Sequence, residues 1–401
     1  MGKENKLHVI ILGKRNKGKS SLINLLTGQE TSIVSEVAGT TTDLVKRSYE
    51  IPGFASVIFI DSAGFDDDGT LGEKRVGKTL QAIEQADVAL LVISGNQFGP
   101  EERALVEKLH KEELPFIIVH NKRDEQPLDD NLQKTLEKEL GCPVIDFSTR
   151  ADTPEPVVEA IKEVWKKQGN DAPKSLIGDL LHPGDIVLLI TPIDSEAPAG
   201  RMILPQVQVT RDILDNHCAA ITLQPEEITP FLSQTGIRPR LAITDSQVFK
   251  KVAPLIPAEI PLTSFSIVLA RHKGDFAAYL RGTPHIDELR DGDRVLMLES
   301  CSHHVSCEDI GRHKIPRWLR ERTGKRLEFD FIAGLDAISR PVTDYAMIIQ
   351  CGGCMITARQ LRTRLRPAIE AGVPVSNYGM TIAYLHGIFQ RAMEPFGQGR
   401  S

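Results

Sequence analysis

The segment GKRNKGKS, residues 13–20, has the residue types and spacing of a phosphate-binding loop. Its two glycines, Lys19 and Ser20 fit the pattern G-x-x-x-x-G-K-S, in which backbone N–H groups cradle phosphates, the lysine reaches the β and γ phosphates, and the serine hydroxyl binds Mg²⁺. An apolar run, residues 7–12, precedes the loop and a helical pattern follows it, which is the setting that this motif requires. We therefore predict a nucleotide site with contacts from the following residues: Gly13, Asn16, Lys17, Gly18, Lys19, Ser20 and Ser21.

A second motif, DSAG, follows the apolar run SVIFI and contributes Asp61 and Gly64. At the end of a strand, an aspartate can reach the magnesium shell and a glycine amide can sense the γ phosphate. We expect Asp61 to bind Mg²⁺ together with Ser20.

Two more motifs are suited to reading a guanine base. The segment NKRD follows the apolar run FIIVH and contains Asn121, Lys122 and Asp124, and this aspartate can accept hydrogen bonds from the N1 and N2 donors of guanine. Ser148 and Thr149 follow PVID, where a backbone N–H can meet guanine O6. Four motifs in this order, each at a strand end, predict a GTP-binding domain.

Two cysteines near the end of the chain, Cys351 and Cys354, form a C-x-x-C pair on a Gly-Gly loop. Such a pair brings two thiolates to one metal and leaves backbone N–H groups for hydrogen bonds to cluster sulfurs. Cys301 adds a third thiolate if its strand neighbours theirs. From the residues alone, an iron–sulfur cluster, a Cys₃His zinc site with His303 and a thioredoxin-like redox pair all stay open.

The fourth position of a cluster held by three cysteines has several candidates. These are His303, His304, Cys307 and Glu308. The two remaining cysteines, Cys142 and Cys218, lie in apolar surroundings and are expected to be core residues.

The chain beyond residue 172 contains two similar segments. HPGDIVLLITP (182–192) resembles RDGDRVLMLES (290–300), and residues 258–276 resemble residues 371–389. Apolar strands alternate with helices in each copy, which predicts a parallel sheet covered on both faces. Only the second copy has cysteines at its strand ends, and ligands of open α/β sheets bind outside the carboxyl ends of the strands.

Length and composition agree with a soluble protein of several domains. The 401 residues exceed the usual size of one hydrophobic core, and a Gly/Asn/Asp/Pro linker at 169–173 indicates a boundary near residue 172. The net charge of -6 argues against a role in coating nucleic acid. No apolar run is long enough to span a membrane, and the start leads straight into a strand pattern, so we expect a cytoplasmic protein.

The four nucleotide motifs, Gly13 to Thr149, resemble those of the Era and TrmE type of GTPase. The resemblance implies that Thr41, or its neighbour Thr40, is the switch threonine on Mg²⁺, and that Lys19, Asp61 and Gly64 serve catalysis. It also implies a role for Asn16 in activation by K⁺. Where many GTPases place a water-orienting Gln after D-x-x-G, this chain has Phe65, so we expect slow hydrolysis unless an ion or partner completes the site.

The full set of motifs resembles the HydF family of FeFe-hydrogenase maturation GTPases. The resemblance rests on the GTPase motifs, a middle domain, and a C-x-H (Cys301, His303) separated from C-G-G-C by about fifty residues. It implies a 4Fe–4S cluster on Cys301, Cys351 and Cys354, with His303 or Glu308 as candidate further ligands. The family usually has His before the C-x-x-C, and this chain has Gln350, which removes one proposed ligand.

The resemblance also implies an architecture and partners. The expected fold is α/β: a P-loop GTPase domain (1–172) followed by two similar small α/β domains with parallel sheets. These are a dimerisation domain (173–264) and an iron–sulfur cluster-binding domain (265–401). The implied function is a GTP-hydrolysing scaffold that receives a transient diiron precursor, built with the radical-SAM maturases HydE and HydG, and delivers it to apo FeFe-hydrogenase. A homodimer is expected, with a tetramer as the alternative.

A different class of function stays open beside it: a ribosome- or RNA-associated Era-type GTPase with a zinc-binding C-terminal module. Its best support is the basic segment RHKIPRWLRERTGKR, residues 312–326. Because Glu321 interrupts this segment at helical spacing, we interpret it as a solvated helix face, and we expect neither nucleic acid nor membrane as a partner.

Overall fold

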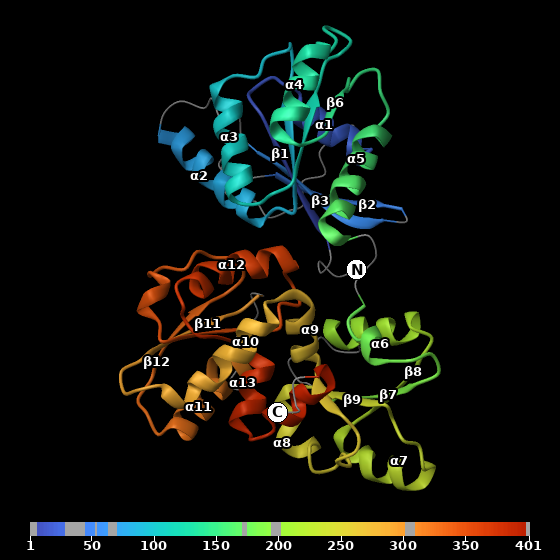
Figure 1. Cartoon of the computed structure of the whole chain (residues 1–401), viewed down its shortest axis with the longest axis vertical. Coiled ribbons are helices and arrows are strands. Elements are labelled where there is room, and N and C mark those ends of the chain that lie inside the picture. Colours follow the sequence, from blue (N-terminus) through green and yellow to red (C-terminus); the bar gives the residue numbers. More distant parts are fainter. Residues whose placement is uncertain are drawn as a thin grey trace. The chain divides into compact units, whose positions relative to one another are not determined.

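The structure of the protein is a computed structural model that describes residues 6–28, 45–52, 54–62, 70–170, 175–193, 202–300 and 309–397 (Figure 1). The chain divides into two compact units, Asn5–Pro173 and Lys174–Ser401. Among the described helices, none combines the length and apolar composition that a membrane span needs.

The first unit is built on a six-stranded sheet with the order β2-β3-β1-β4-β5-β6. Its neighbouring strands are parallel, except that β2 is antiparallel to β3. The strands are β1 (Leu7–Leu12), β2 (Val45–Ile51), β3 (Ala55–Asp61), β4 (Val88–Ile93), β5 (Phe116–His120) and β6 (Val144–Asp146). All six residues of β4 are buried, as expected of a strand covered on both faces.

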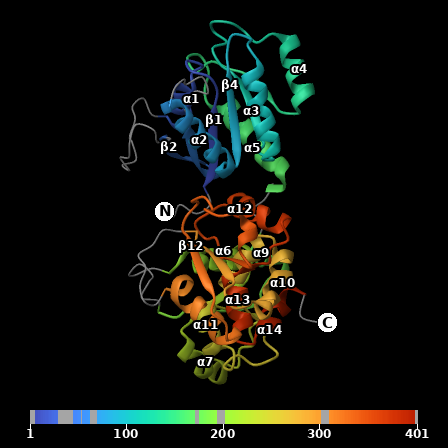
Figure 2. The same ribbon diagram turned by 90° about the vertical axis from the view of Figure 1, so that its left-hand side faces the viewer.

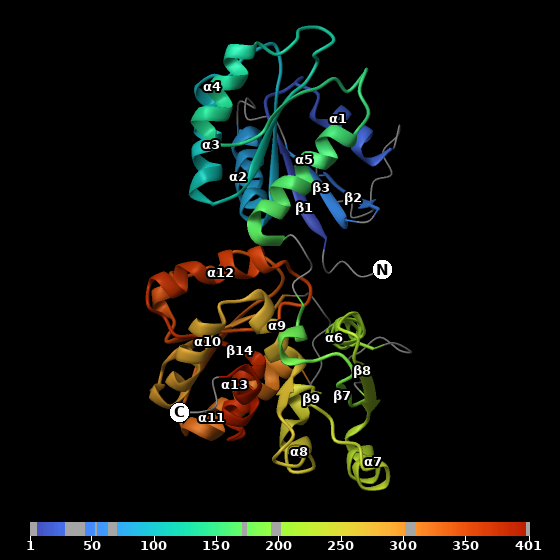
Figure 3. The same ribbon diagram turned by 45° about the vertical axis from the view of Figure 1, so that its right-hand side comes forward.

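Helices cover both faces of this sheet (Figure 3). One face packs against α1 (Lys19–Thr27) and α5 (Glu155–Trp165). The other packs against α2 (Thr70–Gln85), α3 (Pro100–Lys111) and α4 (Asp130–Leu140). Alternate residues of β1 enter the two cores, because successive side chains of a strand point to opposite faces.

The second unit contains two four-stranded sheets in which every neighbouring pair is parallel. The first has the order β10-β9-β7-β8, and the second has the order β14-β13-β11-β12. The strands of the first are β7 (Ile186–Ile190), β8 (Ala219–Leu223), β9 (Leu241–Thr244) and β10 (Leu262–Ser264). Those of the second are β11 (Arg294–Leu298), β12 (Glu328–Ile332), β13 (Met347–Gln350) and β14 (Val375–Asn377).

The two sheets have the same strand order when matched along the chain. β7 corresponds to β11, β8 to β12, β9 to β13 and β10 to β14, and even the registers agree, since Ile190 pairs with Thr244 as Leu298 pairs with Gln350. The fold class predicted from the sequence, a P-loop GTPase domain followed by two similar α/β domains with parallel sheets, is confirmed.

Helices also cover the two smaller sheets. Those associated with the first are α6 (Leu204–Asp215), α7 (Ile228–Thr235), α8 (Phe249–Val252) and α9 (Phe265–Lys273). Those that follow are α10 (Phe276–Gly282), α11 (Ile315–Thr323), α12 (Ala358–Glu370), α13 (Tyr378–Leu385) and α14 (Phe389–Met393). α11 and α12 lie on opposite sides of β12 (Figures 1 and 2). The basic segment is helical as interpreted, and Glu321 pairs with Arg317 on its surface.

Helix α9 contributes to the cores of both small sheets. Its Phe265 and Val268 pack with β7, β9 and α6, whereas Ile267 and Ala270 belong to the core shared with β13, α12 and α13. Ser264 caps the helix by accepting a hydrogen bond from Ile267 N–H. The boundary predicted at residues 264/265 thus falls at the start of a shared helix, and it stays a prediction.

Candidate nucleotide and metal sites

Two glycines of the phosphate-binding loop leave no room for a side chain. Gly13 follows β1 with φ 142°, and a Cβ there would lie 2.3 Å from the carbonyl oxygen of Val92. Gly18 precedes α1 with φ 93°, and a Cβ there would lie 2.2 Å from Asn121 Nδ2. Both distances are far inside van der Waals contact, so the loop needs glycine at these positions. This is the close backbone approach that a phosphate cradle requires.

Lys19 lies beneath the loop with 8% of its surface exposed. Its Nζ donates to the carbonyl oxygens of Gly13 and Lys14, each at 2.8 Å. The ammonium charge therefore sits at the loop, where phosphates of a nucleotide would lie. Asn16 and Ser21 are exposed, and Asn16 has φ 59°, a left-handed conformation in which asparagine is enriched.

Ser20 and Asp61 form the described part of the predicted magnesium site. Ser20 Oγ donates to Asp61 Oδ2 at 2.8 Å, whereas Asp61 Oδ1 is buried and has no hydrogen-bond partner among the described residues. Burial raises the pKa of Asp61, while the Ser20 hydroxyl and the charges of Lys19 and Arg47 act to lower it. The two side chains are suited to bind Mg²⁺. A hard cation prefers oxygen ligands, and it would give the Asp61 Oδ1 atom a partner while also binding the Ser20 hydroxyl oxygen.

Asn121 ties the phosphate loop to the predicted guanine loop. It is buried, its Nδ2 donates to the carbonyl oxygen of Lys17 at 3.0 Å, and its Oδ1 accepts from Thr149 N–H at 3.1 Å. Lys122 follows with φ 68°, so the chain turns sharply after β5. One carboxamide therefore fixes two loops that are far apart in the sequence.

A hydrogen bond from Ser148 positions the Asp124 carboxylate, which can accept further hydrogen bonds. Ser148 Oγ donates to Asp124 Oδ1 at 2.6 Å, and this bond lowers the pKa of the exposed Asp124 carboxyl. The amides of Ser148 and Thr149 already donate to Asp152 Oδ2 and Asn121 Oδ1. The prediction that one of these amides meets guanine O6 therefore stays a prediction.

The sequence reading missed a buried histidine behind this loop. His120, the last residue of β5, is fully buried, and its Nδ1 lies 2.7 Å from Asp146 Oδ1. Its Nε2 accepts from Asn96 N–H at 3.4 Å, and Asp146 Oδ2 accepts from Leu128 N–H at 3.3 Å. The pair thus supports the loops on both sides of NKRD. A histidine directly before this motif was the only signal in the sequence.

Cys351 lies at the carboxyl end of the second small sheet, against the end of β11. Its N–H donates to the carbonyl oxygen of Leu298 at 2.9 Å. Ser300 N–H donates to Cys351 Sγ at 3.1 Å, and Ser300 Oγ lies 2.9 Å from the same sulfur. Ser300 directly precedes Cys301 in the sequence, and Cys301 itself lies outside the described residues. Cys351 and Cys354 are half-buried.

Gln350 is fully buried behind this sulfur. Its Nε2 donates to Ser300 Oγ at 3.0 Å, and lies 3.3 Å from the carbonyl oxygen and 3.4 Å from the Sγ of Cys351. Asn377 Nδ2 donates to the Gln350 carbonyl oxygen at 3.2 Å, while Gln350 Oε1 is buried and has no hydrogen-bond partner among the described residues.

A buried lysine of α9 forms hydrogen bonds with the backbone of the Gly-Gly loop. Lys273, 4% exposed, donates from Nζ to the carbonyl oxygens of Gly353 at 2.8 Å and Ile356 at 3.0 Å. Gly353 has φ 70°, and a Cβ there would lie 2.5 Å from Leu361 Cδ1. The sequence reading missed Lys273, since nothing near it in the chain marks a buried cation.

Charged side chains surround this corner of the sheet. Arg364 of α12 donates from Nη1 to the carbonyl oxygens of Glu299 at 3.0 Å and Gly334 at 2.8 Å, and burial lowers its pKa while the nearby Cys351 sulfur acts to raise it. Arg312 pairs with the buried Glu299 carboxylate at 2.9 Å. The described part of this corner therefore combines the cations Lys273, Arg312 and Arg364 with the carboxylates of Glu299 and Asp309, and the Asp336 carboxylate also acts on Arg364.

Part of the predicted set lies outside the described residues. In the nucleotide site these are Thr40, Thr41, Gly64 and Phe65, and in the metal site Cys301, His303, His304, Cys307 and Glu308. Within the described ranges alone, no group of three or more metal-binding side chains occurs. The metal-site ligand set therefore stays a prediction. Cys142 and Cys218 are buried as expected, and burial raises the pKa of Cys142 to about 12.

The corresponding corner of the first small sheet is built differently. Thr244, in the place of Gln350, donates from Oγ1 to the carbonyl oxygen of Ile190 at 3.2 Å, and Gln206 Nε2 donates to Asp245 Oδ2 at 2.9 Å. Both corners are therefore tied by buried hydrogen bonds, but only the second presents sulfur.

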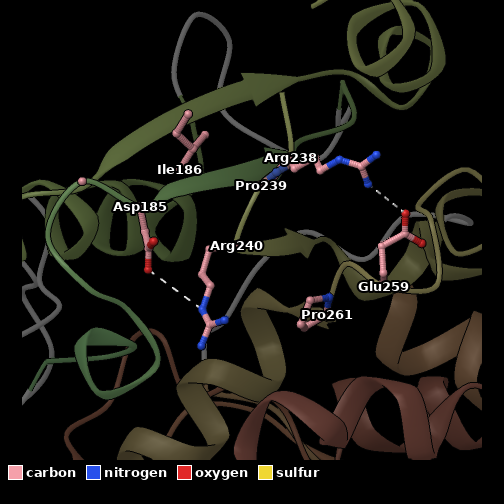
Figure 4. Close-up of a pocket in the computed structure, with 8 residues that line it drawn as sticks. Asp185, Ile186, Arg238, Pro239, Arg240, Glu259 and Pro261 are labelled. Carbon is pink, nitrogen blue, oxygen red and sulfur yellow. Dashed lines mark hydrogen bonds and ion pairs between the residues drawn. The ribbon is translucent and has the colours of Figure 1, made fainter. Parts of the chain in front are cut away.

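An open pocket of this first small sheet lies at the amino ends of its strands (Figure 4). Its walls contain two ion pairs, Arg238 with Glu259 and Arg240 with Asp185. Since ligands of such sheets bind at the carboxyl ends and these cations are already paired, we assign the pocket no function.

Three family models match the chain, and together they cover most of it. Residues 8–122 match a 50S ribosome-binding GTPase domain. Residues 176–274 match the hydrogen maturase F dimerization domain, and residues 277–395 match the hydrogen maturase F tetramerization domain.

Curated relatives match the first unit mainly. The chain is 39% identical over 121 residues to the tRNA modification GTPase MnmE of Hydrogenovibrio crunogenus, which is 29% of this chain and 26% of that protein. It is 35% identical over 188 residues to GTPase Der of a Sulfurihydrogenibium species, which is 42% of this chain and 41% of that protein. The chain thus spans less than half the length of either relative.

Solved structures of GTPases are also similar. Era of Aquifex aeolicus, bound to GDP and AlF₄⁻, is 22% identical and covers 57% of this chain and 98% of its own, with a TM-score of 0.34. The G domain of the FeoB iron transporter of T. maritima is 26% identical and covers 40% of this chain and 99% of its own, with a TM-score of 0.32.

Proposed function

The chain belongs to the hydrogen maturase F family and is a hydrogenase maturation GTPase, and from this premise we propose that it is a GTP-hydrolysing scaffold carrying a 4Fe–4S cluster. In this proposal the cluster is held by Cys301, Cys351 and Cys354. A transient diiron precursor, made with the radical-SAM maturases HydE and HydG, binds there and passes to apo FeFe-hydrogenase.

One observation carries the metal half of this proposal. The backbone of Ser300 lies within hydrogen-bond distance of Cys351 Sγ, at the carboxyl edge of a parallel sheet. That contact joins the two sequence segments that contain the three predicted cysteine ligands. Ligands of α/β sheets bind at this edge, and here thiolates, backbone amides and a Gly-Gly loop meet.

The charges at this corner support a cluster in preference to zinc alone. A cluster held by cysteine thiolates carries net negative charge, and N–H groups that face its sulfurs stabilise it. Lys273 and Arg364 bring buried positive charge, and Ser300 brings an N–H to sulfur. Both side chains donate to backbone carbonyl oxygens, and their positive charge would favour an anionic cluster beside them.

The nucleotide half follows from the first unit. Lys19 would hold the β and γ phosphates, Ser20 and Asp61 would hold Mg²⁺, and Asp124 would select guanine. Thr41 and Gly64 would follow the γ phosphate, and Asn16 would help to bind the stimulating K⁺. Mg²⁺ supplies charge neutralisation at the phosphates when bound, whereas these side chains position the nucleotide.

The GTPase would regulate partner binding or release, and the metal chemistry would stay on the second unit. The family matches to dimerization and tetramerization domains support an oligomeric assembly. We propose a homodimer as the basic assembly, with a tetramer formed from it.

Anaerobic purification tests the proposal. The full chain is expected to be brown, to absorb broadly in the visible range and to contain iron and acid-labile sulfide. Cys354→Ala should lose most of this iron. Cys218→Ala, which removes a buried cysteine of the first small sheet, should keep it. A colourless protein with one zinc per chain would overturn the scaffold proposal and favour a zinc-stabilised module.

A further inference from the structure

The hydrogen bonds at Cys351 involve two residues that the proposed ligand set does not include. Ser300 offers its N–H to Cys351 Sγ at 3.1 Å, and its hydroxyl oxygen lies 2.9 Å from the same sulfur. Gln350 Nε2 bonds Ser300 Oγ at 3.0 Å and lies 3.4 Å from the sulfur. Two N–H donors, from Ser300 and Gln350, therefore face one sulfur, and the Cys351 thiol donates to the Ser300 hydroxyl oxygen.

The orientation of the Gln350 carboxamide follows from its neighbours. Nε2 faces the carbonyl oxygen and sulfur of Cys351, both electron-rich, so exchanging the amide oxygen and nitrogen would place like partial charges 3.3 and 3.4 Å apart. Its main chain is fixed on both sides, since Gln350 pairs with Leu298 of β11 and with Asn377 of β14. A fully buried side chain on so constrained a backbone has little freedom to turn.

The hydroxyl of Ser300 connects the amide to the sulfur. Ser300 Oγ accepts hydrogen bonds from Gln350 Nε2 and from the Cys351 thiol. When Cys351 loses its proton to bind a cluster, the Ser300 hydroxyl can turn its own proton to the thiolate. Each such donor withdraws electron density from the sulfur. Hydrogen bonds to cysteine sulfur are one of the means by which a protein sets the reduction potential of a cluster.

We propose that Ser300 and Gln350 form a donor set for Cys351 Sγ that raises the reduction potential of the cluster. Gln350 is thus a positioning residue and not the fourth ligand. This inference rests on the proposed function, because it concerns the cluster proposed there. It also gives Gln350 a role that a residue in direct contact with iron would not have.

The test compares reduction potentials of anaerobically reconstituted full-length proteins by EPR-monitored redox titration. Gln350→Leu removes the amide with a side chain of similar size, and Ser300→Ala removes the hydroxyl but keeps the backbone N–H. Each is expected to retain the iron and sulfide content of the unchanged protein and to shift the potential to a more negative value. Because the two groups act in series, the double variant should shift less than the sum of the single shifts.

Thr244→Val is the matched control. Thr244 occupies the register position of Gln350 in the cysteine-free sheet and makes a buried hydrogen bond there. Its removal should alter thermal stability but leave the potential unchanged.

The possible outcomes distinguish a failure of the donor-set inference from a failure of the proposed scaffold function. Unshifted potentials in Gln350→Leu and Ser300→Ala, with the cluster present, would overturn the inference and leave the scaffold intact. Loss of iron from Gln350→Leu with an unchanged unfolding temperature would also overturn it, since it would make Gln350 a ligand. If leucine at 350 prevents folding, Ser300→Ala alone decides. An unchanged protein without iron or sulfide would refute the proposed function itself.

Discussion

At the scale of single residues, the buried Oδ1 atom of Asp61 is suited to bind a cation. Its Oδ1 is buried without a donor from the described residues, while Oδ2 is held by Ser20. Leaving such an atom unsatisfied costs about 1–3 kcal/mol, so the fold would carry this cost unless a cation offsets it. The carboxylate is therefore best explained by the metal that the P-loop needs.

Asp61→Asn tests this explanation. The amide keeps the shape of the side chain but removes the charge that would hold Mg²⁺. We expect GTP binding with Mg²⁺ to weaken by about tenfold or more, as the loss of one charge-assisted interaction of about 1.5–3 kcal/mol implies. Calorimetry with Mg²⁺ and with EDTA makes the measurement. Equal affinities of the two proteins with Mg²⁺ would contradict the assignment.

Asn16 offers a second prediction at this scale. It lies on the exposed side of the loop in a left-handed conformation, where its side chain can reach an ion near the phosphates. Replacing Na⁺ by K⁺ should raise the GTP turnover of the unchanged protein several-fold, as about 1 kcal/mol of barrier lowering gives. Asn16→Ala should turn over GTP equally in both salts. Equal GTP turnover of the unchanged protein in Na⁺ and in K⁺ would contradict the role proposed for Asn16.

At the scale of elements, the C-x-x-C loop depends on helix α9, which lies far before it in the sequence. Lys273 at the end of α9 bonds two carbonyl oxygens of that loop, and Ser266 Oγ of the same helix donates to Asn377 Oδ1 at 3.2 Å. The loop is thus positioned by its own strand and by α9 together. Removing the ammonium would leave two carbonyl oxygens without this donor.

Lys273→Met is expected to lower the unfolding free energy of the second unit by about 3–6 kcal/mol, since each of the two lost hydrogen bonds to a charged group contributes about 1.5–3 kcal/mol. Trp318 lies in this unit and Trp165 in the other, so denaturation of the variant in a Trp165→Phe background reports the second unit by fluorescence. Lys251→Met is the control, because Lys251 is half-exposed and pairs only with an exposed Glu226. A loss no larger than the control's would mean that Lys273 does not stabilise the loop.

The sequence predicted those parts of the molecule whose functional residues lie in short motifs at the ends of apolar strands. The glycines of the phosphate loop, Asp61 and Asn121 are recognisable because each motif stands at the end of an apolar strand. The duplicated sheets were visible because the same turn chemistry precedes both opening strands. Lys273 and the role of Gln350 were not predictable, because they depend on helix packing and strand register that bring distant residues together.

At the scale of the whole molecule, the two compact units separate the nucleotide site from the cysteine site. A cluster ligand can therefore be removed without touching a nucleotide contact. Cys301→Ala should abolish cluster assembly, measured as iron and sulfide per chain, while GTP turnover stays within about twofold of the unchanged protein. Loss of both activities would mean that the units do not work independently.

The shared helix α9 has a consequence for the order of events during synthesis. Chains emerge from the ribosome amino end first, and domains generally fold as they appear. Ile267 and Ala270 belong to a core that also includes β13, α12 and α13, which are made more than seventy residues later. The packing of α9 is therefore complete only after residues 347–385 have been translated, a segment that includes Cys351 and Cys354.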